Sequence, residues 1–363
     1  MKAAVLNHVP GKFEIEEVEI DSPKGREVLV DVKASGLCHS DLHLAENDFG
    51  FPLPTVLGHE LSGIVIAVGP GVTEFHPGDR VAGSLLQYCG QCLRCLAGES
   101  YFCDNPGFTQ RDPAEPPRLT RAGEPVAQFF GISAFAEKVL VHENQLAKIP
   151  DAVPFPQASV LGCGCVTGAG AVINSANVQV GESVAVFGVG GVGLNVVNGA
   201  RLAGATRIIA VDLAPAKEEL ARKFGATHFV NAADEDPVSR IQEISGGGVN
   251  HAFEVIGLVA TTRQAVLSTR RGGTAYLIGA HAPGKDITFD IGADLMQFNR
   301  TVRPVFMGSS NIKRDIPMFA ELYLQGRFNL DDLVSQEISL SQINEAYDEL
   351  KKGEIVRSVI TSF

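Results

Sequence analysis

Residues 183–212, SVAVFGVGGVGLNVVNGARLAGATRIIAVD, decide the fold of the second half of this chain. The stretch opens on an apolar run, 183–189, with the length and composition of a buried strand. A glycine-rich turn follows, then a helical stretch to about Ala203 and a second strand at 207–212. A strand, a tight turn, a helix and another strand predict a parallel sheet with helices packed on its faces.

The turn has the glycine spacing that a dinucleotide needs, and it reads Gly188-Val189-Gly190-Gly191-Val192-Gly193. Gly188 permits the tight turn, Gly190 lets the backbone approach a pyrophosphate, and Gly193 allows close packing of helix on sheet. The helix N-terminus offers backbone donors and a positive dipole to the phosphates. A lone motif of this kind is weak, but its place between a strand and a helix favours a dinucleotide-binding domain over an incidental glycine-rich turn.

The choice of dinucleotide rests on Asp212, which ends the second strand. A carboxylate there can accept a hydrogen bond from a ribose 2′-hydroxyl and would repel a 2′-phosphate, so the sequence predicts NAD rather than NADP. Lys217 could reach the same ribose, or it could be a solvated residue of the following helix.

The sequence outside this stretch shows two patterns of secondary structure. Its first 150 residues alternate in short strands such as 26–35, 62–69 and 135–141, with Pro-Gly turns, which indicates a β-rich, barrel-like domain. From about residue 165 strands alternate with helices. There a helix is predicted at 215–225 and strands at 228–232, 251–257 and 274–280. After about 305 the pattern predicts one strong helix, 314–327, and a late strand, 358–363. We therefore expect a β-rich domain formed by 1–164 and 305–363, with an α/β domain, 165–304, inserted.

Composition narrows the class of protein. A chain of 363 residues with 45% hydrophobic and 20% charged residues is typical of a globular protein of two domains. The net charge of −12 argues against nucleic acid as a partner, since phosphate binding requires clustered Lys and Arg. The charged, alternating N-terminus argues against a secretory signal, and no stretch has the roughly 18 apolar residues of a membrane helix. We expect a cytoplasmic protein.

Four of the seven cysteines, Cys89, Cys92, Cys95 and Cys103, lie within fifteen residues. In a reducing cytosol such a cluster indicates a metal site rather than disulfides. Four thiolates satisfy tetrahedral zinc and leave no open position, which is the mark of a structural site. Unrelated buried cysteines would not predict the spacing, no βαβ pattern supports a redox motif, and no basic residues surround the loop as in a nucleic-acid zinc module.

A second zinc site is suggested by Cys38, His59 and Cys163. Two thiolates and a neutral imidazole would leave zinc uncharged, with a fourth position open for water or substrate. The three residues are far apart in sequence, so spacing alone does not join them, and each could equally be a core residue.

Several separate segments resemble the zinc-containing medium-chain alcohol dehydrogenases, and the similarity runs from about residue 3 to the C-terminus. Besides the four-cysteine loop, the glycine-rich turn, Asp212 and Lys217, they are GLCHSD (36–41), GHELSG (58–63) continuing to Gly69 and Val72, GCG (162–164) with Thr167-Gly168, FEVIG (253–257) and EIVRSVI (354–360). The resemblance implies a GroES-like β-rich catalytic domain and a Rossmann domain, two zinc ions per chain, and NAD. Cys165 departs from the family's pattern. We expect it to pack against apolar neighbours.

The resemblance also implies roles for individual residues. Cys38, His59 and Cys163 would ligate the catalytic zinc, and the alcohol would lose hydride to the nicotinamide. Ser40 would take the alcohol proton, which reaches His43 near solvent by way of the cofactor ribose. Asp41 would orient the His59 imidazole, with Glu60 as a further supporting group. The residues implied at the cofactor, besides those of the turn, are His39 and Arg357 at the pyrophosphate, Thr167 and Val192 at the nicotinamide, and Ile278.

The substrate channel of the family is lined by large apolar residues, and the matching positions here are Phe49, Leu85 and Phe129. They suggest medium-chain or aromatic primary alcohols and their aldehydes. Relatives that act on a glutathione–formaldehyde adduct hold it with an acidic residue and an arginine, where this chain has Phe49 and Gly107. A different thiol adduct stays open, because the alignment is loose around the Pro-rich segment 104–130.

Two other classes of function stay in view. A quinone or enone reductase of the same fold needs no zinc, and the cysteines count against it. A non-enzymatic sensor or nucleic-acid module that binds zinc and NAD is opposed by the acidic charge balance and by the complete proton relay. Relatives associate through the Rossmann sheet, so we expect a homodimer, with a tetramer as the alternative.

Overall fold

The computed structural model describes residues 1–353 and 355–363, so Glu354, the first residue of the segment 354–360, lies outside the described residues. The chain divides into two compact units. Unit 1 comprises 1–163, 311–326 and 330–363, and unit 2 comprises 164–310 with 327–329. The chain thus leaves the first unit after Cys163 and returns to it at Asn311, where the sequence led us to expect 164 and 305.

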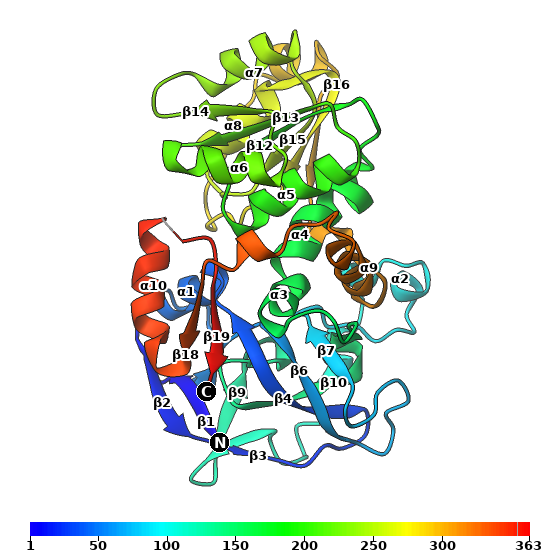
Figure 1. Ribbon diagram of the computed structural model, residues 1–363, viewed down its shortest axis with the longest axis vertical. Helices are drawn as coiled ribbons and strands as arrows, with labels where there is room; N and C mark the ends of the chain where they lie inside the picture. Colours follow the sequence, from blue (N-terminus) through cyan, green and yellow to red (C-terminus); the bar gives the residue numbers. More distant parts are fainter. Residues whose placement is uncertain (354) are drawn as a thin grey trace. The chain divides into compact units, whose positions relative to one another are not determined.

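Unit 1 is built on two sheets, as the alternating pattern of the first 150 residues predicts (Figure 1). The first has the order β2-β1-β5-β9-β8-β3, and the second the order β11-β7-β6-β4-β19-β18 with β10 also paired to β4. The strands are β1 (Lys2–Leu6), β2 (Phe13–Glu17), β3 (Glu19–Ile20), β4 (Glu27–Gly36), β5 (Thr55–Val56), β6 (Glu60–Val68), β7 (Arg80–Gly83), β8 (Leu119–Arg121), β9 (Glu124–Gln128), β10 (Lys138–His142), β11 (Leu146–Lys148), β18 (Gln336–Ser339) and β19 (Ser358–Ser362). The helices are α1 (His39–Glu46), α2 (Leu93–Leu96), α3 (Phe155–Ser159), α9 (Ile312–Leu324) and α10 (Ile343–Lys352).

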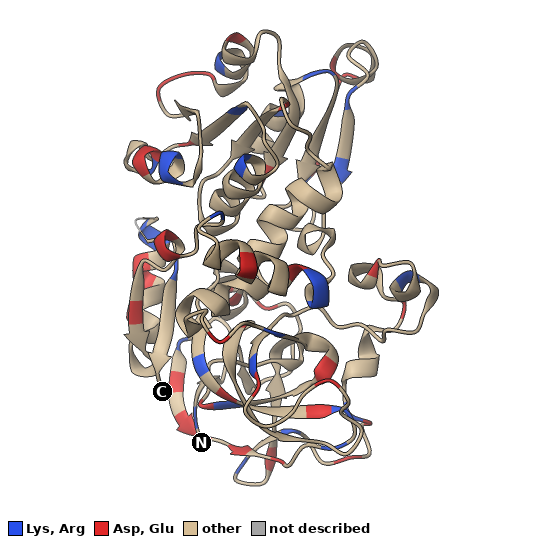
Figure 2. Ribbon diagram, turned by 45° about the vertical axis from the view of Figure 1, so that its right-hand side comes forward, with Lys and Arg blue, Asp and Glu red and all other residues tan. Residues whose placement is uncertain are grey.

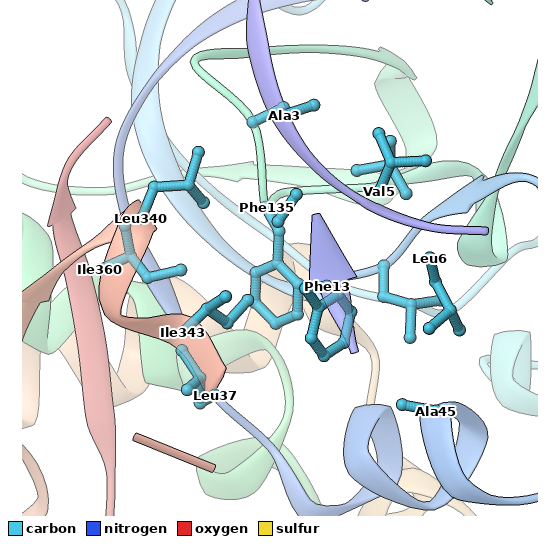
Figure 3. Close-up of a cluster of buried hydrophobic side chains, with 14 of the residues drawn as sticks. Ala3, Val5, Leu6, Phe13, Leu37, Ala45, Phe135, Leu340, Ile343 and Ile360 are labelled. Carbon is cyan, nitrogen blue, oxygen red and sulfur yellow. The ribbon is translucent and has the colours of Figure 1, made fainter. Parts of the chain in front are cut away.

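The core of unit 1 joins segments from both ends of the chain (Figure 3). Phe13 packs edge-on against Phe135, with ring centroids 5.8 Å apart, and stacks on Tyr347 of α10 at 5.5 Å. Leu340 and Ile360 from the C-terminal segment are buried in the same cluster. Burial of such side chains contributes about 1.5–3 kcal/mol each, so the C-terminal segment is an integral part of this unit.

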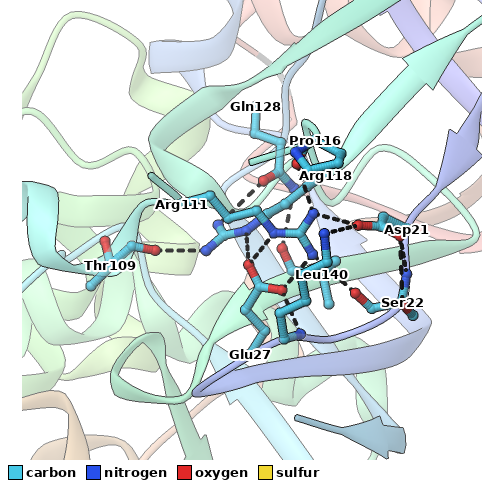
Figure 4. Close-up of polar contacts among 10 residues, drawn as sticks. Asp21, Ser22, Glu27, Thr109, Arg111, Pro116, Arg118, Gln128 and Leu140 are labelled. Atoms are coloured by element: carbon cyan, nitrogen blue, oxygen red, sulfur yellow. Dashed lines mark hydrogen bonds and ion pairs between the residues drawn. The ribbon is translucent and has the colours of Figure 1, made fainter. Parts of the chain in front are cut away.

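A network of buried charges ties the long segment 104–118 to the strands (Figure 4). Nη2 of Arg111 donates to Oε2 of Glu27 at 2.6 Å, and Nε of Arg118 donates to Oε1 of Glu27 at 2.7 Å. Arg111 also pairs with Asp21 at 2.6 Å, and Arg118 donates to the Thr109 carbonyl at 2.7 Å. One buried carboxylate at the start of β4 therefore holds two arginines from a segment that has little regular structure of its own.

Unit 2 is a parallel six-stranded sheet with the order β14-β13-β12-β15-β16-β17, the order of a Rossmann fold. Helices α5 to α8 pack on its strands (Figure 1). The strands are β12 (Ser183–Phe187), β13 (Arg207–Asp212), β14 (His228–Asn231), β15 (Val249–Glu254), β16 (Thr269–Leu277) and β17 (Thr301–Pro304). The helices are α4 (Gly164–Gly170), α5 (Gly191–Leu202), α6 (Glu218–Phe224), α7 (Pro237–Ser245) and α8 (Val259–Leu267).

The elements predicted from 183–212 are confirmed within a few residues, as β12, α5 and β13. The stretch 215–225 begins as a 3₁₀ turn at Pro215–Lys217 before α6, and Gly225, at φ 120°, ends it as predicted. Acidic and basic residues are interspersed along the ribbon (Figure 2). No single described helix has the length and apolarity to cross a membrane, and one bent pair of helices, 155–162 with 164–176, meets the criteria by length and composition.

Candidate active site

Unit 1 brings together three side chains that are far apart in sequence. Cys38 follows β4, His59 precedes β6, and Cys163 ends the first stretch of the unit. Nε2 of His59 lies 3.2 Å from Sγ of Cys163. The potential ligand atoms of Cys38, His59, Cys163 and Glu60 all lie within 4.8 Å of one another, and all four residues are buried. The arrangement predicted from the sequence is therefore present as a compact cluster.

Asp41 holds the imidazole of this cluster in place. Its Oδ1 atom lies 3.0 Å from Nδ1 of His59 and accepts the backbone N–H of Gly58 at 3.1 Å. When a metal ion displaces the proton of Nε2, a carboxylate at Nδ1 keeps the ring in the tautomer that can ligate through Nε2. Burial lowers the pKa of His59, but the charges of Asp41 and Cys38 outweigh it and raise that pKa well above its usual value.

Glu60 and Arg357 complete the electrostatics of the cluster. Nη2 of Arg357 lies 2.9 Å from Oε1 of Glu60 and 3.7 Å from Sγ of Cys38. Burial raises the pKa of Glu60 to about 7, although the Arg357 charge opposes this. Arg357, which the resemblance assigned to the cofactor pyrophosphate, thus has its guanidinium against the thiol cluster in unit 1.

The four-cysteine loop closes around one point as well. The Sγ atom of Cys89 lies 3.6 Å from that of Cys103 and 4.0 Å from that of Cys95, and Cys92 and Cys103 are 3.9 Å apart. Backbone N–H groups point at the sulfurs, among them Cys92 N at 3.3 Å from Cys89 Sγ. A hydrogen bond from the Cys95 backbone lowers the pKa of Cys92 to about 6, which favours a thiolate.

Both clusters fit zinc by their dimensions. In a tetrahedron with zinc–sulfur bonds of about 2.3 Å, neighbouring sulfurs lie about 3.8 Å apart, which agrees with the distances of 3.6, 3.9 and 4.0 Å in the loop. With a zinc–nitrogen bond of about 2.0 Å, nitrogen and sulfur lie about 3.5 Å apart, close to the observed 3.2 Å. The loop offers four thiols, whereas the buried cluster offers two thiols, one imidazole and one carboxylate.

The residues assigned to the proton relay lie on α1, immediately after Cys38. Oγ of Ser40 is 3.8 Å from Sγ of Cys38, so the hydroxyl borders the thiol cluster. His39, Ser40 and His43 are all exposed on this helix. Because residues three apart lie on the same helix face, His43 follows Ser40 toward solvent.

One aromatic ring contacts the cluster and carries further rings behind it. The Phe129 ring packs edge-on against the His59 ring, with centroids 6.1 Å apart. Phe51 lies 5.5 Å from Phe129 and 6.2 Å from Phe130, and it is 43% exposed. Phe49, half exposed, lines a small cavity of ≈ 20 Å³ together with Phe51 and Phe129. The structure therefore brings the predicted Phe49 and Phe129 together.

The residues around this cavity differ in part from the predicted substrate positions. Leu85 is half-buried and is not among the residues that line the small cavity. Phe51 and Phe130 were not predicted. The adjacent pair Phe129-Phe130 was the signal available in the sequence. In the structure, Phe130 has a left-handed φ of 46°, an uncommon conformation that clusters at functional sites.

The glycine-rich turn of unit 2 has the geometry of a dinucleotide site. Gly188, at φ 94°, turns the chain after β12, and α5 begins at Gly191. A Cβ atom on Gly193 would lie 1.8 Å from the Gly188 carbonyl oxygen, so only glycine fits there. The N-terminus of α5 is left facing the end of the sheet where ligands of this fold bind.

Asp212 supports the turn from the next strand. Its Oδ2 atom accepts the Val189 N–H at 3.0 Å and lies 3.1 Å from Nζ of Lys217. The structure thus places the predicted Asp212 and Lys217 side by side at the carboxyl end of β13. Thr167 and Ile278 also belong to unit 2, where Thr167 Oγ1 donates to Sδ of Met307 at 3.5 Å and the Ile278 N–H donates to the Glu254 carbonyl at 2.8 Å.

A β-rich unit with two zinc-sized clusters, and a parallel sheet with a dinucleotide turn, define the class of zinc-binding dehydrogenases. Comparison with known proteins agrees. Residues 24–151 match the family described as “Alcohol dehydrogenase GroES-like domain”, and residues 191–323 match “Zinc-binding dehydrogenase”. The chain belongs to the zinc-containing medium-chain alcohol dehydrogenase family.

Individual relatives resemble the chain over its whole length. It is 38% identical to the NDMA-dependent alcohol dehydrogenase of Amycolatopsis methanolica, over 99% of this chain and 98% of that protein. A solved alcohol dehydrogenase zinc-binding domain protein from Burkholderia ambifaria is 40% identical, with a TM-score of 0.95 over 100% and 98% of the two chains. The benzyl alcohol dehydrogenase of Acinetobacter calcoaceticus is 38% identical, with a TM-score of 0.93 over 100% and 99%.

Proposed function

We propose that this alcohol dehydrogenase oxidises aromatic and medium-chain primary alcohols to aldehydes, reversibly, with NAD as the hydride acceptor and two zinc ions per chain. The observation that carries the proposal is the His59 ring, which lies 3.2 Å from the Cys163 thiol and 6.1 Å from the Phe129 ring. A metal-binding cluster therefore directly adjoins an aromatic surface. An alcohol that has a ring next to its hydroxyl carbon fits that junction.

Cys38, His59 and Cys163 would hold the catalytic zinc, and Cys89, Cys92, Cys95 and Cys103 the structural one. When bound, the catalytic zinc supplies Lewis acidity that lowers the pKa of an alcohol hydroxyl. The two thiolates and the neutral imidazole balance the charge of the ion. Asp41 keeps the imidazole in the ligating tautomer, and Glu60 adds a fourth potential ligand atom to the cluster.

The chain also provides a route for the proton of the alcohol. Ser40 stands next to Cys38 at 3.8 Å, where its hydroxyl can take the proton, and the exposed His43 lies three residues along the same helix. Histidine exchanges protons readily near neutral pH, so the proton can leave to solvent there. The Gly188 turn, Asp212 and Lys217 would hold NAD, which would supply the hydride acceptor for the reaction.

The substrate class follows from the aromatic surface. Phe51, Phe129 and Phe130 form a set of mutually edge-on or tilted rings, which is the arrangement that another aromatic ring extends favourably. The similarity to a benzyl alcohol dehydrogenase supports this choice. Small alcohols would make fewer contacts with these rings and would bind more weakly.

The proposed assembly is a homodimer. β17 ends the parallel sheet and, in the described residues, pairs only with β16. Exposed apolar residues flank it, among them Ile291, Met296 and Phe306. An open strand edge with apolar neighbours can pair with a second copy and so extend the sheet.

The test combines metal content with turnover. We expect about two zinc ions per chain. Cys38→Ser should lose one of them together with activity, while Cys92→Ser should lose the other and lower the melting temperature. NAD-linked oxidation should be fastest with benzyl-type alcohols in a panel that includes straight-chain alcohols. One zinc per chain, held by the loop alone, would contradict the catalytic assignment and favour a zinc-independent reductase.

The hydride acceptor needs a separate experiment, because one relative is NDMA-dependent. Turnover should be measured with NAD alone, with NADP alone, and with NDMA added to each. Activity with NAD alone is the expected result. Activity that requires NDMA would contradict the proposed use of NAD as a sufficient acceptor, and activity on thiol–formaldehyde adducts but on no simple alcohol would contradict the proposed substrate.

A further inference from the structure

A buried carboxylate organises the turn that follows β15 in unit 2. Glu254, the last residue of that strand, is fully buried. Its Oε1 atom accepts the backbone N–H groups of Ile256 at 2.9 Å and Gly257 at 2.8 Å, and the Thr261 hydroxyl at 2.8 Å. One oxygen thus fixes both the turn 255–258 and the start of α8. Its other oxygen, Oε2, faces His281 at 4.0 Å.

His281 comes from the loop after β16, and its hydrogen bonds constrain its protons. Nδ1 lies 2.9 Å from the Gly279 carbonyl, which can only accept, so Nδ1 bears a proton. Nε2 lies 2.7 Å from the Thr262 hydroxyl, which is also 2.9 Å from the Leu258 carbonyl. The imidazole therefore links the Thr262 hydroxyl of α8 to the Gly279 carbonyl of its own loop.

The two loops also meet through their backbones. A Cβ atom on Gly257 would lie 2.4 Å from the Ala280 carbonyl oxygen, and one on Gly279 would lie 2.1 Å from the Gly257 N atom. Gly257 has φ 89°, so the position favours glycine for its conformation as well as for its lack of a side chain. The loop after β16 therefore covers the turn after β15, and His281 is the side chain that links them.

The turn held by Glu254 supports the dinucleotide turn. A Cβ atom on Gly188 would lie 2.6 Å from Cγ1 of Ile256, and one on Gly193 would lie 3.3 Å from Cγ2 of Val255. Ile256 is 45% exposed, so part of its side chain remains available to a ligand on the turn. This is the point between β12 and β15 where the strand order reverses and where ligands of such sheets bind.

We infer that His281 and Glu254 are positioning residues for the dinucleotide: together they hold the turn 255–258 against Gly188 and so set the affinity for NAD. The inference rests on the proposed use of NAD. Neither residue is proposed to contact the reacting atoms. Their effect is on cofactor binding and on the order of one turn, and leaves the chemistry of the alcohol untouched.

The matched variants come from the network itself. His281→Ala removes the link from a partly exposed loop residue, so the fold should persist. Thr262→Val removes the hydroxyl partner of Nε2 with little change of shape, and Thr262→Ser restores it. His251→Ala is the control. His251 lies on β15, as Glu254 does, but it pairs with Glu182 at 2.9 Å, away from the turn.

Three readouts separate a positioning role from general damage. Calorimetric titration should show NAD binding about 3- to 10-fold weaker in His281→Ala and Thr262→Val, the effect of one lost hydrogen bond, and near wild type in Thr262→Ser and His251→Ala. The KM for NAD should rise by the same factor while kcat and the KM for the alcohol stay constant. Without NAD, hydrogen exchange at the Ile256 and Gly257 amides should be faster in His281→Ala and Thr262→Val, and near wild type in His251→Ala.

Equal NAD affinities in wild type and His281→Ala, or an equal loss in His251→Ala, would overturn the positioning role while the proposed function stands. No NAD binding by the wild type would overturn the cofactor assignment, and this role with it. Unchanged exchange at the Ile256 and Gly257 amides would overturn the structural link between His281 and the turn.

Discussion

Nδ1 of His59 lies 3.0 Å from Oδ1 of Asp41, and both side chains are fully buried. The same Asp41 oxygen accepts the Gly58 N–H, so the carboxylate fixes both the ring and the backbone just before it. A histidine restrained in this way loses little freedom when it binds a metal, and its Nε2 atom is a stronger ligand.

The first prediction concerns that contact. Asp41→Asn keeps an acceptor near Nδ1 but removes the charge, so zinc at the buried cluster should bind about 10- to 100-fold more weakly. Chelator competition should show one zinc leaving earlier and the zinc of the four-cysteine loop leaving as before. Glu182→Gln, which removes the charge from the His251 pair, is the control and should change neither. Unaltered zinc release in Asp41→Asn would refute the role of Asp41.

The second prediction concerns cofactor choice. Asp212→Ala removes the acceptor of the Val189 N–H and the charge that opposes a 2′-phosphate. The ratio of kcat/KM for NAD to that for NADP should therefore fall by about 10- to 100-fold. Asp236 is a suitable control, because it also accepts a backbone N–H, that of Ser239 at 2.9 Å, but at the start of α7. Asp236→Ala should lower stability and leave the ratio unchanged. A constant ratio in Asp212→Ala would count against NAD recognition by this residue.

The third prediction concerns the aromatic surface. Phe51→Ala should raise the KM for benzyl alcohol about 2- to 10-fold, since edge-on ring contacts contribute about 0.5–1.5 kcal/mol beyond burial. The KM for a short aliphatic alcohol should change less, because such a substrate has no ring to contact. Phe102→Ala removes another half-exposed ring, which packs on Tyr101 at 4.6 Å in the four-cysteine loop, and should leave both values unchanged. Equal changes for both alcohols would contradict an aromatic preference.

The fourth prediction concerns acid stability. Burial alone would raise the pKa of Glu27, but the hydrogen bonds and charges of Arg111 and Arg118 outweigh it and lower the pKa. Asp21 behaves alike, and its hydrogen bonds lower the pKa to about 2 against the burial effect. A carboxylate whose pKa is lower in the folded state stabilises fully above the unfolded pKa, about 4, and progressively less as the pH falls below it.

Glu27→Gln should therefore lower the free energy of unfolding by about 3 kcal/mol at pH 7, the scale for breaking a buried ion pair. The difference from wild type should shrink as the pH falls from 5 toward 3. Urea unfolding at a series of pH values measures this, and comparison of the two proteins at each pH removes any acid effect that they share. Glu14→Gln, at an exposed position, should follow wild type throughout. A difference that grows toward acid would have the opposite sign and would contradict the stabilising role of the ionised Glu27.

Much of the fold could be predicted because its signals are local. The strand, turn and helix after residue 183 are specified by apolar residues and glycines a few positions apart, and the structure differs from the expectation by only one or two residues at the ends. The boundary near 310 was placed less well. Residues 305–310 pack on α4, where the Ser310 hydroxyl donates to the Val166 carbonyl. No local sequence pattern predicts such a contact.

The contacts that sequence reasoning missed share one property. Phe51 with Phe129, Glu27 with Arg111, and Glu254 with His281 are each brought together by turns of the chain between them. A phenylalanine, a glutamate or a histidine has no pattern of its own that reveals such a partner. Only the packing of the strands and loops between the partners sets these distances.

The sequence by itself determined the two sites whose residues are close along the chain, the four-cysteine loop and the glycine turn with its Asp212. Their geometry is closed by short stretches of backbone, and so spacing and residue type suffice. The tertiary structure decided the cluster of Cys38, His59 and Cys163, of which the last two are 104 residues apart. The sheets of unit 1 bring these residues within ligand distance, because burying their apolar faces fixes where each strand ends.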